Sequence, residues 1–210
     1  MSDTATLTFA DRLLELIAVI LLGITTVGTA WCGFQAARWN GQSGDLSRVA
    51  SAQQVESARL FGLATQRVAY DSMVVAKYAE ASQAGNAALL KFYRESLVRP
   101  PFLPVLDRWE ASVKAGGQTV GVFDDKDYLA AEFAAYQETV AASEQANRES
   151  QQAGEVADGY VGTTILLAVA LFFAGVTSSF LYRPARMLLL IAATGTVAIA
   201  AARIADLPIL

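Results

Sequence analysis

Residues 159–202 read GYVGTTILLAVALFFAGVTSSFLY, RPAR and MLLLIAATGTVAIAAA in succession, and this stretch decides the fold. Two uncharged, apolar runs flank a short segment that carries Arg183 and Arg186. A helix needs about 20 apolar residues to cross a hydrocarbon core about 30 Å thick. The sequence therefore predicts transmembrane helices over residues 159–182 and 187–206, joined by a loop at 183–186.

A further apolar run lies at residues 13–34 and is interrupted only by Glu15. The segment before it, residues 1–12, carries two acids and one arginine, and no small-residue cleavage site follows the run. These features favour a retained transmembrane helix over a removed signal peptide.

The short arginine loop also predicts the topology. Because positive charge in short loops favours the cytoplasmic side, Arg183 and Arg186 are expected inside. The N-terminus is then cytoplasmic, residues 35–158 form an extracytoplasmic domain, and the tail at 207–210 lies outside. Arg38 and Arg48 favour the opposite orientation, but long domains cross the membrane largely regardless of their charge.

Composition narrows the range of functions. The 210 residues include no histidine and a single cysteine, Cys32, and the net charge is −4. Without histidine the chain lacks the commonest metal ligand and general base. The acidic balance disfavours nucleic-acid binding. Asp124 and Asp125 are typical helix-capping residues rather than metal ligands. The sequence therefore predicts no catalytic residue, no cofactor site and no metal site, and a protein that is not an enzyme.

The central domain is expected to be helical almost throughout. Breaks are predicted at Gly41 and Gly44, at residues 85–86, at 99–101 and at 116–117, with a short extended piece at 120–123. Two long segments carry a 3–4 residue spacing that is apolar far from the membrane and polar near it. The fold class is thus all-α: three transmembrane helices with an antiparallel, coiled-coil-like helical hairpin outside the membrane, its tip at about 85–123. The large side chains of this spacing are expected to be buried: Leu60, Leu63, Tyr70, Leu129, Phe133 and Tyr136.

Polar residues replace apolar ones where the hairpin approaches the membrane. Two alternatives fit this pattern: a solvated base between splayed helices, or a hydrophilic vestibule above a pore that forms when several copies assemble. The residues concerned are Gln53, Glu56, Ser143, Asn147 and Gln151.

Small residues in the spans predict helix–helix contacts, because they let helix backbones approach closely in lipid. The contacts are either within the chain or to another subunit. The first span contributes Thr25, Gly28, Thr29 and Gly33, and the third contributes Ala193, Val197 and Ala201. Aromatic residues are expected at the outer membrane interface (Trp31, Trp39, Tyr160) and at the inner one (Tyr182).

The segment at 31–36, Trp-Cys-Gly-Phe-Gln-Ala, resembles the W-x-x-[YF]-Q-A segment of an uncharacterised family of three-span bacterial inner-membrane proteins, a domain of unknown function. The resemblance implies the bacterial inner membrane, one N-terminal span, a helical middle and two C-terminal spans, but no known activity. Ala37 stands where that family usually has a lysine.

Two functions are expected from these observations. The first is a non-enzymatic scaffold or accessory subunit of a homo- or hetero-oligomeric membrane complex. The alternative is an oligomeric channel or transport component with a polar vestibule. The partners in either case are the lipid bilayer and further copies or other membrane subunits.

Overall fold

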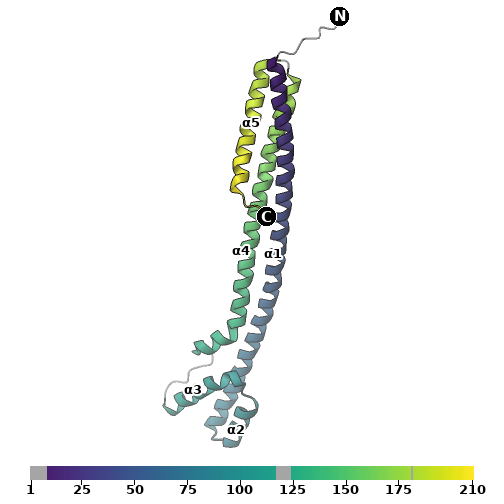
Figure 1. Ribbon diagram of the computed structural model, residues 1–210. Helices are drawn as coiled ribbons and strands as arrows, with labels where there is room; N and C mark the ends of the chain where they lie inside the picture. The colour runs from purple at the N-terminus through teal and green to yellow at the C-terminus, as the bar shows by residue number, and fades with distance from the viewer. Residues whose placement is uncertain (1–8, 117–123, 181) are drawn as a thin grey trace. The chain divides into compact units, whose positions relative to one another are not determined.

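The structure is a computed structural model that describes residues 9–116, 124–180 and 182–210, with the side chains of Ala10 and Asp11 left out (Figure 1). Every regular element in these ranges is helical, which confirms the predicted all-α class. The elements are α1 (Phe9–Gln83), α2 (Ala87–Ser96), η1 (Pro100–Phe102), α3 (Leu103–Lys114), α4 (Lys126–Val176), η3 (Thr177–Ser179) and α5 (Arg183–Asp206).

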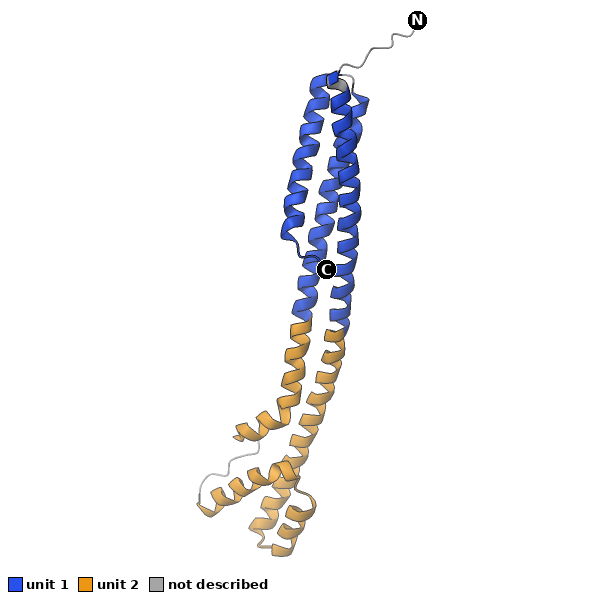
Figure 2. Ribbon diagram, viewed as in Figure 1, with its two compact units in different colours: residues 1–48, 147–210 blue, residues 49–146 orange. Residues whose placement is uncertain are grey.

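Three of these helices, α1, α4 and α5, are long and apolar enough to cross a membrane, as the sequence predicts. The chain divides into two compact units, coloured separately in Figure 2. The first unit comprises Met1–Arg48 and Asn147–Leu210 and contains the membrane-spanning segments. The second unit, Val49–Ala146, contains the remainder of α1 and α4 together with α2, η1 and α3.

Helix α1 continues through Gly41 and Gly44, so the breaks predicted there are wrong. A glycine inside a helix costs only about 1 kcal/mol, which packing can outweigh. Ser43, between the two glycines, donates a hydrogen bond to the main-chain oxygen of Ser150 at 2.9 Å, and Ser150 donates to the main-chain oxygen of Ser43 at 2.8 Å. This close contact with α4 holds the helix where local propensity alone would end it.

The breaks predicted at 85–86 and 99–101 are confirmed, since α1 ends at Gln83 and α2 at Ser96. Gly85 adopts a φ of +65° after α1, and the side chain of Asn86 caps α2 by accepting from the main-chain nitrogen of Leu89 at 3.1 Å. Asp125 caps α4 by accepting from the main-chain nitrogen of Tyr128 at 2.9 Å. Gly117 and the extended piece at 120–123 lie outside the described residues.

The connection between α4 and α5 falls earlier than the sequence indicates. Helix α4 ends at Val176 and η3 at Ser179, and α5 already begins at Arg183. The predicted loop at 183–186 is therefore the first turn of α5. Pro184 occupies the start of this helix, where its missing N–H leaves no hydrogen bond unmade.

Within the second unit, the buried seam of α1 consists of small residues as far as Ala64 and of larger ones beyond it. Five buried residues recur at every seventh position, Ala50, Ser57, Ala64, Asp71 and Tyr78, and Val68, Val74 and Ala81 are buried as well. Ser143 of α4 donates a hydrogen bond to the main-chain oxygen of Ala50 at 3.0 Å, so the two backbones lie close together.

The large side chains predicted to be buried are at most half-buried, and Leu129 and Phe133 pack against the core from its edge. Tyr70 is 37% exposed, and the others are only half-buried: Leu60, Leu63, Leu129, Phe133 and Tyr136. Alanine and serine occupy the buried positions of α1 as far as Ala64, where the large side chains flank them, whereas Val68, Val74 and Tyr78 are buried further along the helix. The apolar core of the second unit lies further along the chain, around Phe102 and Leu106, both fully buried.

Candidate functional sites

The predicted contact residues of the spans fall into two groups. In α1, Thr25 is fully buried, and a side chain at Gly28 would meet Leu167 of α4 at 3.2 Å. In α5, Ala193 is fully buried in a cluster with Ala18 of α1, and Thr29 and Val197 are half-buried. Gly33 and Ala201 instead lie on exposed faces, and Ala200 is buried in place of Ala201.

The aromatic residues predicted at the membrane interfaces also fall into two groups, one exposed and one in contact with the C-terminal tail. Trp31 and Tyr182 are exposed, and their place at a membrane interface stays a prediction. Trp39 and Tyr160 are engaged in a contact that the sequence does not reveal. The indole nitrogen of Trp39 and the hydroxyl of Tyr160 both donate to the main-chain oxygen of Pro208, each at 3.1 Å.

These two bonds are part of a site that holds the C-terminal tail, residues 207–210, against α1 and α4. Gln35, almost fully buried, accepts a hydrogen bond from the main-chain nitrogen of Leu210 at 3.2 Å, and Arg38 donates to its main-chain oxygen at 2.7 Å. Leu207 lies over Gly159, where an added Cβ would be 2.8 Å from it. The tail thus supplies a hydrogen-bond partner, Leu210, to the buried Gln35 and to Arg38, which lie 175 and 172 residues before it in the sequence.

The residues of the predicted vestibule are not gathered in either unit. In the first unit, Asn147 and Gln151 are exposed, and neither lines the cleft of about 330 Å³ that Gln42, Glu149 and Gln152 border with other residues. The other three residues of the predicted vestibule lie in the second unit, each with different contacts. Glu56 pairs with Arg59 at 2.5 Å, Ser143 bonds to Ala50, and the buried oxygen of the Gln53 side chain accepts no hydrogen bond.

The most elaborate polar site is a buried network in the second unit, which we call the Asp71 network: Asp71, Arg99, Tyr128 and Glu132. The side chain of Asp71 is 1% exposed and that of Glu132 is 7% exposed. Arg99, which precedes η1, donates to Asp71 at 2.5 Å and to Glu132 at 2.8 Å. The hydroxyl of Tyr128 donates to Asp71 at 2.5 Å. One guanidinium therefore joins carboxylates from α1 and α4.

This arrangement raises the pKa values of Arg99 and Tyr128. Hydrogen bonding to Asp71, together with Glu132, raises the pKa of Arg99 above its usual range, although burial opposes the shift. Burial raises the pKa of Tyr128 well above its usual value, and its hydrogen bond to Asp71 raises it further. Tyr128 therefore stays a neutral donor and Arg99 a cation. Asp71 is the only acid in the buried heptad positions of α1, and that position is the one sequence signal that could have revealed the network.

Removing the Tyr128 hydroxyl provides a pH-dependent test of the network. Tyr128→Phe should lower the free energy of unfolding by about 1.5–3 kcal/mol at neutral pH, because a hydrogen bond to a carboxylate is lost. A raised tyrosine pKa stabilises the fold below the unfolded-state value of about 10, and this contribution is lost as pH rises further. Denaturant unfolding between pH 8 and 11 should therefore show a shallower alkaline decline in the variant. Tyr136→Phe is the control, and an unchanged slope in Tyr128→Phe would contradict this assignment.

A second polar group connects α1, α2 and α3. The hydroxyl of Tyr78 donates to Glu110 at 2.5 Å, and Arg94 lies 3.3 Å from the same carboxylate oxygen. Arg94 also pairs with Asp107 at 2.5 Å. Burial and the bond to Glu110 raise the pKa of Tyr78. As in the Asp71 network, the polar groups fix one helix against another.

One face of α1 in the second unit is exposed and carries no charge. We call it the α1 apolar face. Val55 and Met73 are its largest members, 73% and 61% exposed, and Thr65 is its one polar member. The face follows a spacing of three and four residues and consists of Val55, Ala58, Gly62, Thr65, Ala69, Met73 and Ala76, all exposed.

Comparison with known proteins provides no relative: the chain matches no family model, no curated protein and no solved structure.

Proposed function

We propose that this protein is a non-enzymatic integral membrane protein that serves as a scaffold or accessory subunit of a homo- or hetero-oligomeric membrane complex. The α1 apolar face is the observation that carries the proposal. A water-exposed helix normally places charged and polar residues on the side away from its core. An extended apolar face is instead typical of a protein–protein interaction site.

The residues of this face suit a further helix as partner. Their spacing of three and four residues is the spacing at which one helix packs on another. A Cβ added at Gly62 would meet nothing within 4 Å, so another helix can approach closely there. Helix–helix contacts of this kind need no polar anchor, because alanine and glycine allow extensive contact between the backbones.

The polar groups of the second unit support a structural role rather than a catalytic one. Arg99 is held by Asp71 and Glu132, and Arg94 by Asp107 and Glu110. Groups that are fixed in ion pairs between helices are not poised to exchange protons with a substrate. We therefore assign no catalytic residue and no cofactor.

We place the protein in the bacterial inner membrane, with its N-terminus in the cytoplasm and residues 35–158 in the periplasm. The arginines in the first turn of α5 and the resemblance of the segment at 31–36 support this placement. Protease added to sealed spheroplasts should cut near residue 117. Cleavage in inverted vesicles alone would reverse the topology.

The assembly is tested by placing a charge on the α1 apolar face. In mild detergent the wild-type protein should have the mass of several copies, or should copurify with other membrane subunits. Ala69→Glu should release single copies, because burying an unpaired carboxylate opposes association. Ala52→Glu is the matched control and should retain the assembly. It also changes an exposed alanine of α1, but one that lies roughly 100° around the helix from Ala69.

Two outcomes would contradict the proposal. A strict monomer with no copurifying protein would exclude a scaffold. A ring of identical subunits that conducts ions after reconstitution would favour the channel or transport function instead.

A further inference from the structure

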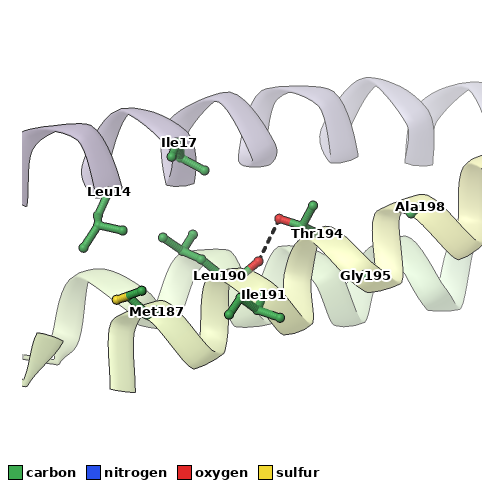
Figure 3. Close-up of a pocket in the computed structure, with 8 residues that line it drawn as sticks. All are labelled: Leu14, Ile17, Met187, Leu190, Ile191, Thr194, Gly195 and Ala198. Atoms are coloured by element: carbon green, nitrogen blue, oxygen red, sulfur yellow. Dashed lines mark hydrogen bonds between the residues drawn. The ribbon is translucent and has the colours of Figure 1, made fainter. Parts of the chain in front are cut away.

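An apolar groove lies between α1 and α5 in the membrane-spanning part of the first unit (Figure 3). Its volume is about 510 Å³, within the range of roughly 300–1,000 Å³ that is typical of ligand pockets. Leu14 and Ile17 line it from α1, and α5 contributes Met187, Leu190, Ile191, Thr194, Gly195 and Ala198.

The groove presents hydrocarbon to whatever occupies it. Thr194 is the single polar side chain among its lining residues, and its hydroxyl donates to the main-chain oxygen of Leu190 at 2.8 Å, the dashed line in Figure 3. A polar ligand would find only the oxygen of this one hydroxyl as a hydrogen-bond partner. Since the groove belongs to membrane-spanning helices, the matching occupant is an acyl chain.

The dimensions favour one acyl chain over a helix. The lining residues of α5 extend from Met187 to Ala198, which corresponds to roughly 17 Å of helix. A volume of about 510 Å³ over this length gives a mean cross-section of roughly 30 Å². A helix about 10 Å across has a cross-section of roughly 80 Å² and does not fit inside the groove.

Charge at one end of the groove indicates the headgroup. Arg183 precedes Met187 by four residues and Leu190 by seven, so it extends the lining face of α5 by one turn. It is exposed and stands at the N-terminus of this helix, where anions are favoured. Glu15 of α1, next to Leu14, is turned off the lining face by the helical repeat. A phosphodiester is the anion that accompanies an acyl chain in a bilayer, and basic pockets between membrane helices recognise such headgroups.

We propose that the α1–α5 groove binds an anionic phospholipid, with one acyl chain in the groove and the phosphate at Arg183. This inference is independent of the assembly through the α1 apolar face, because the residues concerned belong to different units.

The groove is tested by filling it. The purified protein is titrated in detergent with dioleoyl phosphatidylglycerol or dioleoyl phosphatidylcholine, and bound lipid is counted by native mass spectrometry. Gly195→Leu should lose at least ten-fold in affinity for both lipids, because its side chain enters the groove. Gly23→Leu is the matched control: a Cβ at either glycine meets nothing within 4 Å, and Gly23 is absent from the lining. Ala198→Leu is the second groove-filling variant, and the melting temperature of each variant verifies its fold.

The headgroup is tested separately with Arg183→Gln. The wild-type protein should prefer phosphatidylglycerol, and the variant should lose about five-fold of this preference, which corresponds to about 1 kcal/mol for one arginine near the membrane surface. Arg12→Gln is the control. Equal affinity of the wild type for the two lipids, or full binding by both groove-filling variants, would overturn the proposal. Disulfide-linked dimers formed through Ala198→Cys in native membranes would also overturn it, by placing a second copy in the groove.

Discussion

Replacement of Arg99 by methionine should destabilise the second unit by about 3–5 kcal/mol. Asp71 and Glu132 are both buried, and the Arg99 guanidinium lies 2.5 Å from the first and 2.8 Å from the second. Arg67 is 3.8 Å from the other oxygen of Glu132, too far for a hydrogen bond, and that oxygen accepts none. Without Arg99 the carboxylates of Asp71 and Glu132 would remain buried with little positive charge beside them. Removal of one partner from a buried ion pair is strongly destabilising, because it leaves an uncompensated charge in the interior.

Amide hydrogen exchange of α3 in the full-length protein measures this effect, because it reports the opening of the second unit by itself. Protection should fall by roughly two to four orders of magnitude. Arg59→Met is the matched control: Arg59 pairs with Glu56 on the exposed surface of α1, and its removal should leave exchange unchanged. Equal losses of amide protection in Arg99→Met and Arg59→Met would mean that the Asp71 network stabilises the second unit no more than an exposed ion pair does.

Truncation of Phe102 to alanine should also cost about 3–5 kcal/mol. Phe102 is fully buried, and its ring meets that of Tyr128 edge-on, with centroids 5.2 Å apart. The change would leave a cavity in the core that joins η1 to α1 and α4, and this neighbourhood cannot collapse without moving the Asp71 network.

Phe92 supplies the control for this cavity. It is 52% exposed and contacts Tyr93 at 6.0 Å between ring centroids. Phe92→Ala should therefore change the exchange of α3 by only a small fraction of the effect of Phe102→Ala, and Phe102→Leu should recover most of the loss. A Phe92→Ala effect as large as that of Phe102→Ala would place the stabilising core elsewhere.

The sequence predicts the spans and most helix ends because these depend on short stretches of chain. Apolar length determines which helices can cross a membrane. Asn86 and Asp125 cap the helices that follow them, and the prolines at 100–101 separate α2 from α3, all through neighbouring residues. The sequence also singles out Gln35 and Trp39, but not their binding partners.

The buried seam could not be predicted because its register depends on the partner helix. Small residues stand side by side in α1, and only the approach of α4 decides that Ser57 is buried while the neighbouring Ala58 is exposed. The same approach keeps α1 helical through Gly41 and Gly44 and moves the large side chains to the flanks.

The sequence by itself determined an all-α chain with three membrane-spanning helices, since helical propensity, capping and hydropathy act over a few residues. The tertiary structure alone decided which polar side chains meet. Asp71 and Arg99 are 28 residues apart, Asp71 and Tyr128 are 57 apart, and Gln35 and Leu210 are 175 apart. Such pairs carry no local signature, because each side chain is stabilised by a partner that only the packing of distant helices brings within reach.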